Sequence, residues 1–231
     1  MSSKIPEHKP EKVRLDLQLT LGSVLDWIEG RGGCASCPLY DMGRRPLVVR
    51  PSSEAGVKAV VVTESPWEPD WDVDVATSIM NIPTFPYLYC LFRGMFRPRE
   101  DANVYWTHVC KCPLKNVKPL EKRRAMSFCS KTYLKAEIEA AKPLLAVAVG
   151  RSALSYFARE TGDSRLKAGL ERAFLNQTGG IYEGVRLGSA TFSLAIAPHP
   201  SGKSRFWNRP PREADQAFKR IIQDIERILK T

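Results

Sequence analysis

Two of the three histidines stand where a predicted β-strand ends, close to other side chains that can do acid–base chemistry. His108 closes the stretch VYWTH, and His199 follows the run TFSLAIA by two residues. Another β-branched run ends directly before Glu64 and Ser65. Ligands of an open parallel sheet bind beyond the carboxyl ends of its strands, so these four side chains are expected to converge on one site. The alternative for Glu64 is that it begins a helix.

The loop that begins at His199 is rich in side chains that suit phosphate contacts. Hydroxyl and cationic groups bind phosphate oxygens, together with backbone N–H groups. The residues of this loop that are expected to contact nucleic acid are Ser201, Lys203, Ser204 and Arg205. A short motif of this kind also fits an ordinary polar loop.

The cysteines form a second candidate site. The spacing of one close pair and two later cysteines predicts four thiolate ligands around one metal: Cys34, Cys37, Cys112 and Cys129. Both zinc and an iron–sulfur cluster accept this donor set, and zinc is the commoner structural metal. A redox C-x-x-C normally begins a helix after a strand, whereas this pair follows a helix and a glycine turn. The remaining alternative is a set of buried or paired thiols. Cys110 is a further possible ligand, and Cys90 is expected to be a core thiol.

The elements that must position these residues alternate between strand and helix patterns. Strands are expected at 57–63, at the beginning of the stretch 104–113, at 143–150 and at 191–197. Helices are expected at 15–28, 87–96, 121–141, 151–160 and 212–230. Residues 161–179 are expected to be irregular, and residues 181–187 to form a small hairpin around Gly184. The alternation predicts an α/β fold, a three-layer α/β/α sandwich with a central, largely parallel four-stranded sheet.

Length and charge limit the kinds of protein that this chain can be. Its 231 residues suit a single domain over 15–231, preceded by a flexible basic arm over 1–14. The formal net charge of +10 favours a polyanionic partner such as nucleic acid, with solubility alone as the alternative. No apolar run is long enough for a membrane span or a signal peptide, so an intracellular protein is expected. In such a chain, six cysteines indicate metal binding or catalysis before disulfides.

Taken together and in order, these motifs resemble the iron–sulfur branch of the uracil-DNA glycosylase superfamily. The segments that carry the resemblance are the Cys34 to Leu39 motif, VVVTESPW (60–67), THVCKCP (107–113), Cys129, KPLLAVAVG (142–150) and PHPS (198–201). The first three segments resemble that branch's opening cysteine pair, its Gly-Glu-Ala/Gly-Pro-Gly loop and its Thr-Asn-Val-Val-Lys-Cys strand. The last three resemble its fourth cysteine, the strand that follows it and its His-Pro-Ser loop.

The resemblance implies a monofunctional DNA-repair glycosylase that acts on a deaminated base, uracil first, flipped out of DNA into a pocket. It implies a structural 4Fe-4S cluster on the four cysteines and binding of damaged DNA. Zinc is the alternative occupant of the same four cysteines, and a monomer is expected. By position, His199 is implied to donate to the departing base and Ser65 to hold the attacking water. The resemblance also places Glu64 at the pocket wall beside Ser65, and it implies that the Phe85 ring stacks on the base.

Three positions depart from the family pattern. Thr63 and Trp67 replace glycines that let the backbone approach the base, and His108 replaces the asparagine that reads uracil. An asparagine side chain offers a donor and an acceptor at one end, which imidazole does not. These departures favour a second hypothesis, a catalytically silent nucleic-acid-binding iron–sulfur protein on the same scaffold. A third hypothesis is a zinc-stabilised α/β enzyme that acts on free nucleotides.

Overall fold

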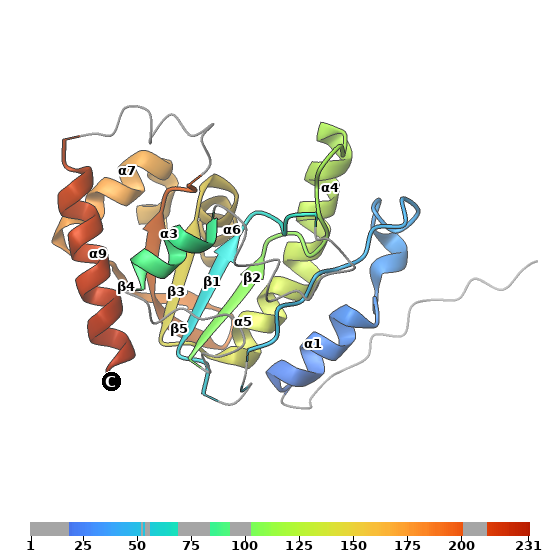
Figure 1. The fold of residues 1–231 in the computed structure, drawn as a ribbon, viewed down its shortest axis with the longest axis horizontal. Coiled ribbons are helices and arrows are strands. Elements are labelled where there is room, and N and C mark those ends of the chain that lie inside the picture. Colours follow the sequence, from blue (N-terminus) through green and yellow to red (C-terminus); the bar gives the residue numbers. More distant parts are fainter. Residues whose placement is uncertain (1–18, 52, 54–55, 69–83, 93–102, 201–211) are drawn as a thin grey trace, which may run out of the picture.

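The computed structural model describes residues 19–51, 53, 56–68, 84–92, 103–200 and 212–231. In these residues one five-stranded sheet has the order β2-β1-β3-β5-β4 (Figure 1). The strands are β1 (Ala59–Thr63), β2 (Val104–His108), β3 (Leu145–Val149), β4 (Tyr182–Leu187) and β5 (Ala190–Ala197). Neighbouring strands pair in parallel, except that β4 pairs with β5 in the antiparallel direction. The predicted fold class is therefore confirmed.

The expected sheet of four strands is wrong by one strand, because the small hairpin expected around Gly184 does not form. Gly184 lies inside β4, where the pairing with β5 shifts register between Tyr182 and Val185. Its positive φ of 67° is the backbone conformation that such a bulge requires and that glycine adopts without strain. The reversal instead comes after Leu187, so that β4 and β5 themselves form the hairpin.

The helices are α1 (Leu21–Glu29), α3 (Thr84–Leu91), α4 (Pro119–Cys129), α5 (Lys135–Ala141), α6 (Arg151–Thr161), α7 (Leu170–Leu175) and α9 (Ala214–Leu229). On one side of the sheet, α6 packs against β1 and β3, and α1 packs against α5. On the other side, α7 packs against β5 and contacts α9 (Figure 1). The sheet is thus the middle of three layers, and no described helix is long and apolar enough to cross a membrane.

Three local expectations need correction. The helix expected over 121–141 is interrupted by a π-helical stretch, η2 (Ser130–Leu134), directly after Cys129. Residues 161–179 are not simply irregular, since they contain α7 and short 3-10 turns on either side of it. Cys90 is exposed on α3 and is not a core thiol. The buried face of α3 carries Thr84, Leu88 and Leu91 at helical spacing, and Cys90 lies off that face.

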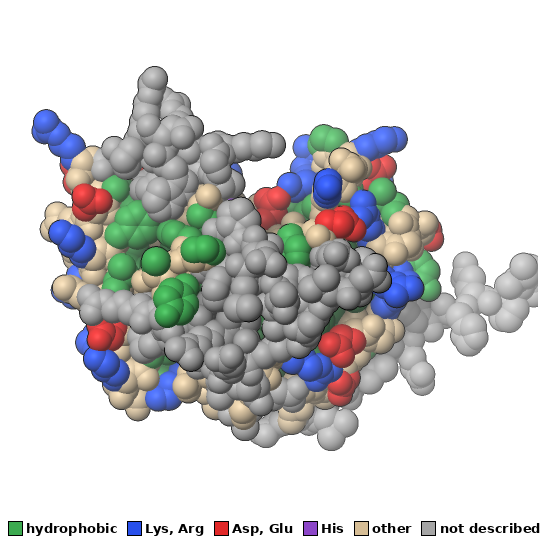
Figure 2. Space-filling view, viewed as in Figure 1, with side chains coloured by type: hydrophobic (Ala, Val, Ile, Leu, Met, Phe, Trp, Pro, Cys, Tyr) green, Lys and Arg blue, Asp and Glu red, His purple; other side chains and the backbone are tan. Residues whose placement is uncertain are grey.

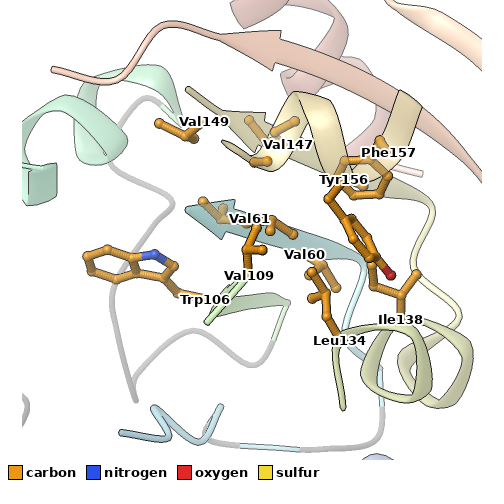
Figure 3. Close-up of a cluster of buried hydrophobic side chains, with 14 of the residues drawn as sticks. Val60, Val61, Trp106, Val109, Leu134, Ile138, Val147, Val149, Tyr156 and Phe157 are labelled. Atoms are coloured by element: carbon orange, nitrogen blue, oxygen red, sulfur yellow. The ribbon is translucent and has the colours of Figure 1, made fainter. Parts of the chain in front are cut away.

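The core lies on both faces of the central strands. Every residue of β1, β2 and β3 is buried, as expected for parallel strands covered on both faces. Figure 3 shows Leu134 and Ile138, from η2 and α5, gathered with Tyr156 of α6 beside Val60 of β1. This packing holds the three strands together, and their carboxyl ends position the candidate site.

Candidate active site and cysteine cluster

A cavity of about 460 Å³ lies at the carboxyl ends of β1, β2, β3 and β5. Its polar and aromatic lining residues are Thr63, Glu64, Ser65, Trp67, Thr84, Trp106, Arg151, Ser152 and His199. Three of the four residues expected to converge here, namely Glu64, Ser65 and His199, therefore line one cavity. The position agrees with the general rule for ligand sites in open α/β sheets.

His199 is held against the end of β3 by a close backbone approach. The backbone N–H of Gly150 donates to the carbonyl of Ala197, two residues before His199, at 2.7 Å. Gly150 has φ +87°, and a Cβ atom added there would lie 3.0 Å from the His199 Cβ. Burial lowers the pKa of His199 below its usual value, although the nearby Glu64 carboxylate opposes that shift. His199 is therefore a neutral imidazole at pH 7, with one N–H to donate.

Glu64 joins three elements at the rim of the cavity. Its carboxylate accepts hydrogen bonds from the Lys122 ammonium group of α4 and from the Ser152 hydroxyl of α6. Burial acts to raise the pKa of the Glu64 carboxyl, but these two hydrogen bonds and the Lys122 charge outweigh burial and lower it. Glu64 is consequently an oriented carboxylate at neutral pH, facing the cavity that His199 also lines.

His108 lies behind the cavity wall. Its Nδ1 is 2.6 Å from the Thr63 Oγ1, which also accepts a hydrogen bond from the Trp106 Nε1 at 3.2 Å. Thr63 and Trp106 line the cavity, whereas His108 is not among the lining residues and is 2% exposed. Burial, with a smaller contribution from the Lys111 charge, lowers the pKa of His108 well below its usual value. Its buried Nε2 has no hydrogen-bond partner within the described part of the chain.

Two tryptophans supply an aromatic wall that the sequence reasoning missed. Trp106 and Trp67 have ring centroids 6.0 Å apart, with an angle of 34° between the ring planes, and both line the cavity. Phe85, the stacking residue chosen from the sequence, falls in α3, but its side chain lies outside the described residues. The sequence did carry a signal for Trp106, because it precedes His108 by two residues in the predicted strand and so lies on the same face of that strand.

The sequence also led to no expectation that Arg151, Ser152 and Lys122 belong to the site. The first two begin α6 directly after β3, so the rule of strand ends would have found them. Lys122 gave no such signal, because it meets Glu64 across 58 residues of sequence. The expected phosphate-binding residues Ser201, Lys203, Ser204 and Arg205 lie outside the described residues.

The four cysteines singled out by spacing are all buried free thiols: Cys34, Cys37, Cys112 and Cys129. A hydrogen bond with Cys129, followed by burial, raises the pKa of Cys37 above its usual value. Burial, together with the thiols of Cys129, Cys34 and Cys37, raises the pKa of Cys112 to about 12. The four side chains therefore interact in one region, although they come from a 3-10 turn, a loop and a helix end.

These thiols are not arranged as a finished coordination shell. Among the described residues, no group of three or more His, Cys, Asp or Glu side chains stands in position to hold a metal ion. Coordination requires every sulfur to point at one centre, which is a stricter condition than the electrostatic proximity described above. The donor chemistry itself, four buried thiols without disulfide partners, fits a thiolate-held metal centre. Cys110 is also buried, with its Sγ 4.0 Å from the Cys129 Sγ, and lies beyond the end of β2 and not within a strand.

A buried polar network ties the Cys110–Cys112 segment to the helix that follows Cys129. The Lys111 ammonium donates to the Thr107 Oγ1 and the His108 carbonyl, both at 2.7 Å, and to the Glu137 carboxylate of α5. Glu137 also accepts from the Tyr105 hydroxyl at 2.6 Å and from the Thr107 hydroxyl at 3.1 Å. All three Lys111 protons thus have acceptors, which is what a buried ion pair requires.

Comparison with known proteins agrees with this architecture. Residues 78–226, more than half of the 231-residue chain, match the family model described as the uracil DNA glycosylase superfamily. That match includes His108, Cys112, Cys129 and His199, and begins after Glu64 and the Cys34–Cys37 pair. No curated protein matches the chain. The strand-end cavity and the family match lead to one conclusion, that the chain belongs to the uracil DNA glycosylase superfamily.

Proposed function

We propose that this protein is a monofunctional DNA glycosylase that removes a deaminated base, uracil first, from DNA. The observation that carries the proposal is the pairing of a neutral His199 with an ionised Glu64 on one cavity of a glycosylase-superfamily chain. Hydrolysis of an N-glycosidic bond needs a donor toward the departing base and a negative environment near the sugar. His199 supplies the donor, and the Glu64 carboxylate supplies the negative charge.

In the proposed reaction the target nucleotide is flipped out of the DNA stack into the cavity. The C1′–N bond breaks with its electron pair going to the base, and the His199 N–H donates a hydrogen bond to the base oxygen where negative charge develops. The Glu64 carboxylate faces the positive charge that appears on the sugar. Ser65 orients the water whose oxygen bonds to C1′, and the proton of that water passes to solvent or to the released base.

The aromatic wall supports base binding in this scheme. A flipped base presents a flat π face, and base–aromatic stacking contributes about 1–3 kcal/mol per base in single-strand binding sites. Trp106 is better supported than Phe85 for this role, because its ring lines the cavity. A base that stacks on Trp106 would lie beside Thr63, which separates it from His108.

We also propose that Cys34, Cys37, Cys112 and Cys129 hold a 4Fe-4S cluster in a structural role, with zinc as the alternative occupant of the same ligands. Such a centre would join the segment before β1 to the segment that follows β2 and to the end of α4. The Lys111–Glu137 network supports this role, since it immobilises the segment that carries Cys112.

A second candidate function is a catalytically silent nucleic-acid-binding protein on the same scaffold. The burial of His108 behind Thr63 favours it, because the position that reads uracil in the family is here away from the cavity lining. A scaffold that has lost its base reader could still bind DNA through charge alone. The two candidates differ in one measurable property, the release of a base.

The deciding experiment is single-turnover base release, with enzyme in excess, from oligonucleotides that contain uracil, hypoxanthine or xanthine. We expect release of at least one base by the full chain, and a loss of about 10² to 10³ in rate for His199→Ala with little change in DNA affinity. His8→Ala, which alters the histidine of the N-terminal arm, is the matched control. Absence of release from all three substrates would refute glycosylase activity on these bases and favour the silent protein.

A further inference from the structure

The start of α4 and the loop before it carry a dense set of exposed cations. Four of them define what we name the α4 ridge: Lys115, Lys118, Arg123 and Arg124. Within the described part of the chain, none of the four side chains forms an ion pair or a hydrogen bond. The only acid between residues 115 and 124 is Glu121. The ridge therefore presents uncompensated positive charge, and the start of α4 adds the positive end of a helix dipole.

Other surface cations of this protein are often neutralised within the chain. Arg44 pairs with Glu68 at 2.7 Å, Arg50 pairs with Glu29 at 2.8 Å, and Arg165 pairs with Asp163 at 2.6 Å. Lys122, the remaining cation of the α4 start, pairs with Glu64. The ridge is thus a local excess of charge and not merely the average basic surface of a chain with net charge +10.

The ridge lies next to the candidate active site. Lys122 stands one helical turn after Lys118 and reaches the Glu64 carboxylate that lines the cavity. The Glu64 carboxylate also accepts a hydrogen bond from Ser152 at the start of α6. The neighbouring residue Arg151 is exposed and lines the cavity as well. In Figure 1 the α4 segment projects past the end of the sheet, and in Figure 2 Lys and Arg side chains gather on this projection.

We propose that the α4 ridge binds the phosphate backbone of a nucleic-acid strand whose base is presented to the cavity. This proposal rests on the proposed function for the identity of the ligand. From Lys118 to Arg124 the helix advances about 9 Å, at 1.5 Å per residue. That length corresponds to about two to three nucleotides of a strand, at 3.4 Å each. Phosphates flanking a flipped nucleotide would therefore meet several ridge cations at once.

The test compares two full-length variants that each lose four positive charges. The ridge variant is Lys115→Ala, Lys118→Ala, Arg123→Ala and Arg124→Ala. The matched control is Lys167→Ala, Arg172→Ala, Arg186→Ala and Lys219→Ala, which changes exposed cations on η3 (Ser164–Ala168), α7, β4 and α9. In Figure 1, α7, α9 and β4 lie toward the edge of the sheet opposite the α4 side. Thermal unfolding of both variants checks that each is folded.

The measured quantity is the Kd for a fluorescent oligonucleotide, with and without uracil, over a series of salt concentrations. Neutralising one phosphate contributes about 0.7–0.9 to the slope of log K against log salt. We expect the slope of the ridge variant to be shallower than that of the wild type by about 3, and its Kd at low salt to rise at least about tenfold. The control should keep the wild-type slope to within about one unit. Equal slopes in the two variants would overturn the proposal.

Two further arms separate this proposal from its alternatives. Loss of polyglutamate binding in the ridge variant, with DNA binding unchanged, would overturn the proposal in favour of an acidic protein partner. Single-turnover base release by the wild type is measured in parallel at saturating enzyme. A wild type that releases no base while the ridge variant loses DNA affinity would refute the proposed function and support the ridge. A wild type that releases a base while the two variants bind DNA alike would support the function and refute the ridge.

Discussion

Glu64 and Ser152 are joined by a hydrogen bond from the Ser152 hydroxyl to the Glu64 carboxylate, although 88 residues separate them in the sequence. The bond links the end of β1 to the start of α6 across the mouth of the cavity. Together with Lys122, it orients the carboxylate before any substrate arrives. Such preorganisation makes a charged group effective, because no reorganisation is needed during the reaction.

Ser152→Ala should move the acid limb of the pH–rate profile toward higher pH. A hydrogen bond to the charged form lowers the pKa of a carboxyl, so its removal raises the pKa of Glu64. As the pH falls, the variant then loses the ionised Glu64 earlier than the wild type does. The measurement is single-turnover base release between about pH 4 and pH 8. Ser155→Ala, at an exposed position one turn along α6, is the control, and identical profiles for both variants would contradict the role of Glu64.

Gly150→Ala should displace His199 and slow cleavage. The new Cβ would lie 3.0 Å from the His199 Cβ, and the position also requires φ +87°. Gly162→Ala is a matched control, because Gly162 has φ +67° with no atom within 4 Å of an added Cβ. Gly162→Ala should lose about 1–2 kcal/mol of unfolding free energy through left-handed backbone strain, and Gly150→Ala should lose more, because its ψ of 176° lies in a region that only glycine adopts readily. Only Gly150→Ala should also lose cleavage rate, and an equal loss in both would remove the steric argument.

His108→Asn tests whether the residue behind the cavity wall affects base choice. Imidazole presents its donor and acceptor on opposite edges, whereas an amide presents both at one end. If His108 reads the base, the asparagine variant should favour uracil over hypoxanthine more strongly than the wild type does. The comparison is of relative single-turnover rates on the two substrates. Thr63→Val, which removes the hydroxyl bonded to His108 Nδ1, separates reading from packing, and unchanged ratios in both variants would assign His108 to packing alone.

Replacing any one of the four cysteines by alanine should remove the proposed metal centre and destabilise the fold, because site assembly is coupled to folding. Anaerobically purified wild type is expected to be brown and to contain iron and acid-labile sulfide. Cys34→Ala, Cys37→Ala, Cys112→Ala and Cys129→Ala should each lose the visible absorbance and lower the unfolding temperature. Cys90→Ala, at an exposed position on α3, should change neither property. A colourless wild type with one tightly bound zinc would replace the iron–sulfur assignment and keep the four ligands.

Lys111→Met should destabilise the protein by about 3–5 kcal/mol, because it leaves the Glu137 carboxylate buried without its cation. The double variant Lys111→Met with Glu137→Leu removes both charges and should recover much of that loss. Free energies of unfolding from urea titrations check both values. Lys135→Ala changes an exposed position on α5, the helix that carries Glu137, and its free energy of unfolding should stay within about 0.5 kcal/mol of the wild type. A double variant that is as unstable as the single one would contradict the ion-pair argument.

The strands and their ends were predictable because the signal is local. A run such as AVVVT, β-branched and without breakers, favours a strand buried on both faces, and it stops at Thr63. The alternation of strands and helices then predicts a parallel sheet, and parallel strands bring their carboxyl ends to one edge. Glu64, Ser65 and His199 could be assigned to one site on this basis. The fifth strand was missed because Gly184, at a bulge, breaks the alternating pattern of β4.

The contacts that give those residues their chemistry were decided only by the tertiary structure. Glu64 is an oriented carboxylate because Lys122 and Ser152 reach it from α4 and α6, and no period or spacing in the sequence encodes that meeting. His108 ends β2 as predicted, yet its side chain is on the far side of Thr63 from the cavity. The sequence alone determines which residues end each strand, since strand formation follows from neighbouring side chains. Which of those residues face a cavity, and which partners shift their pKa values, depends on how helices distant in sequence pack against the sheet.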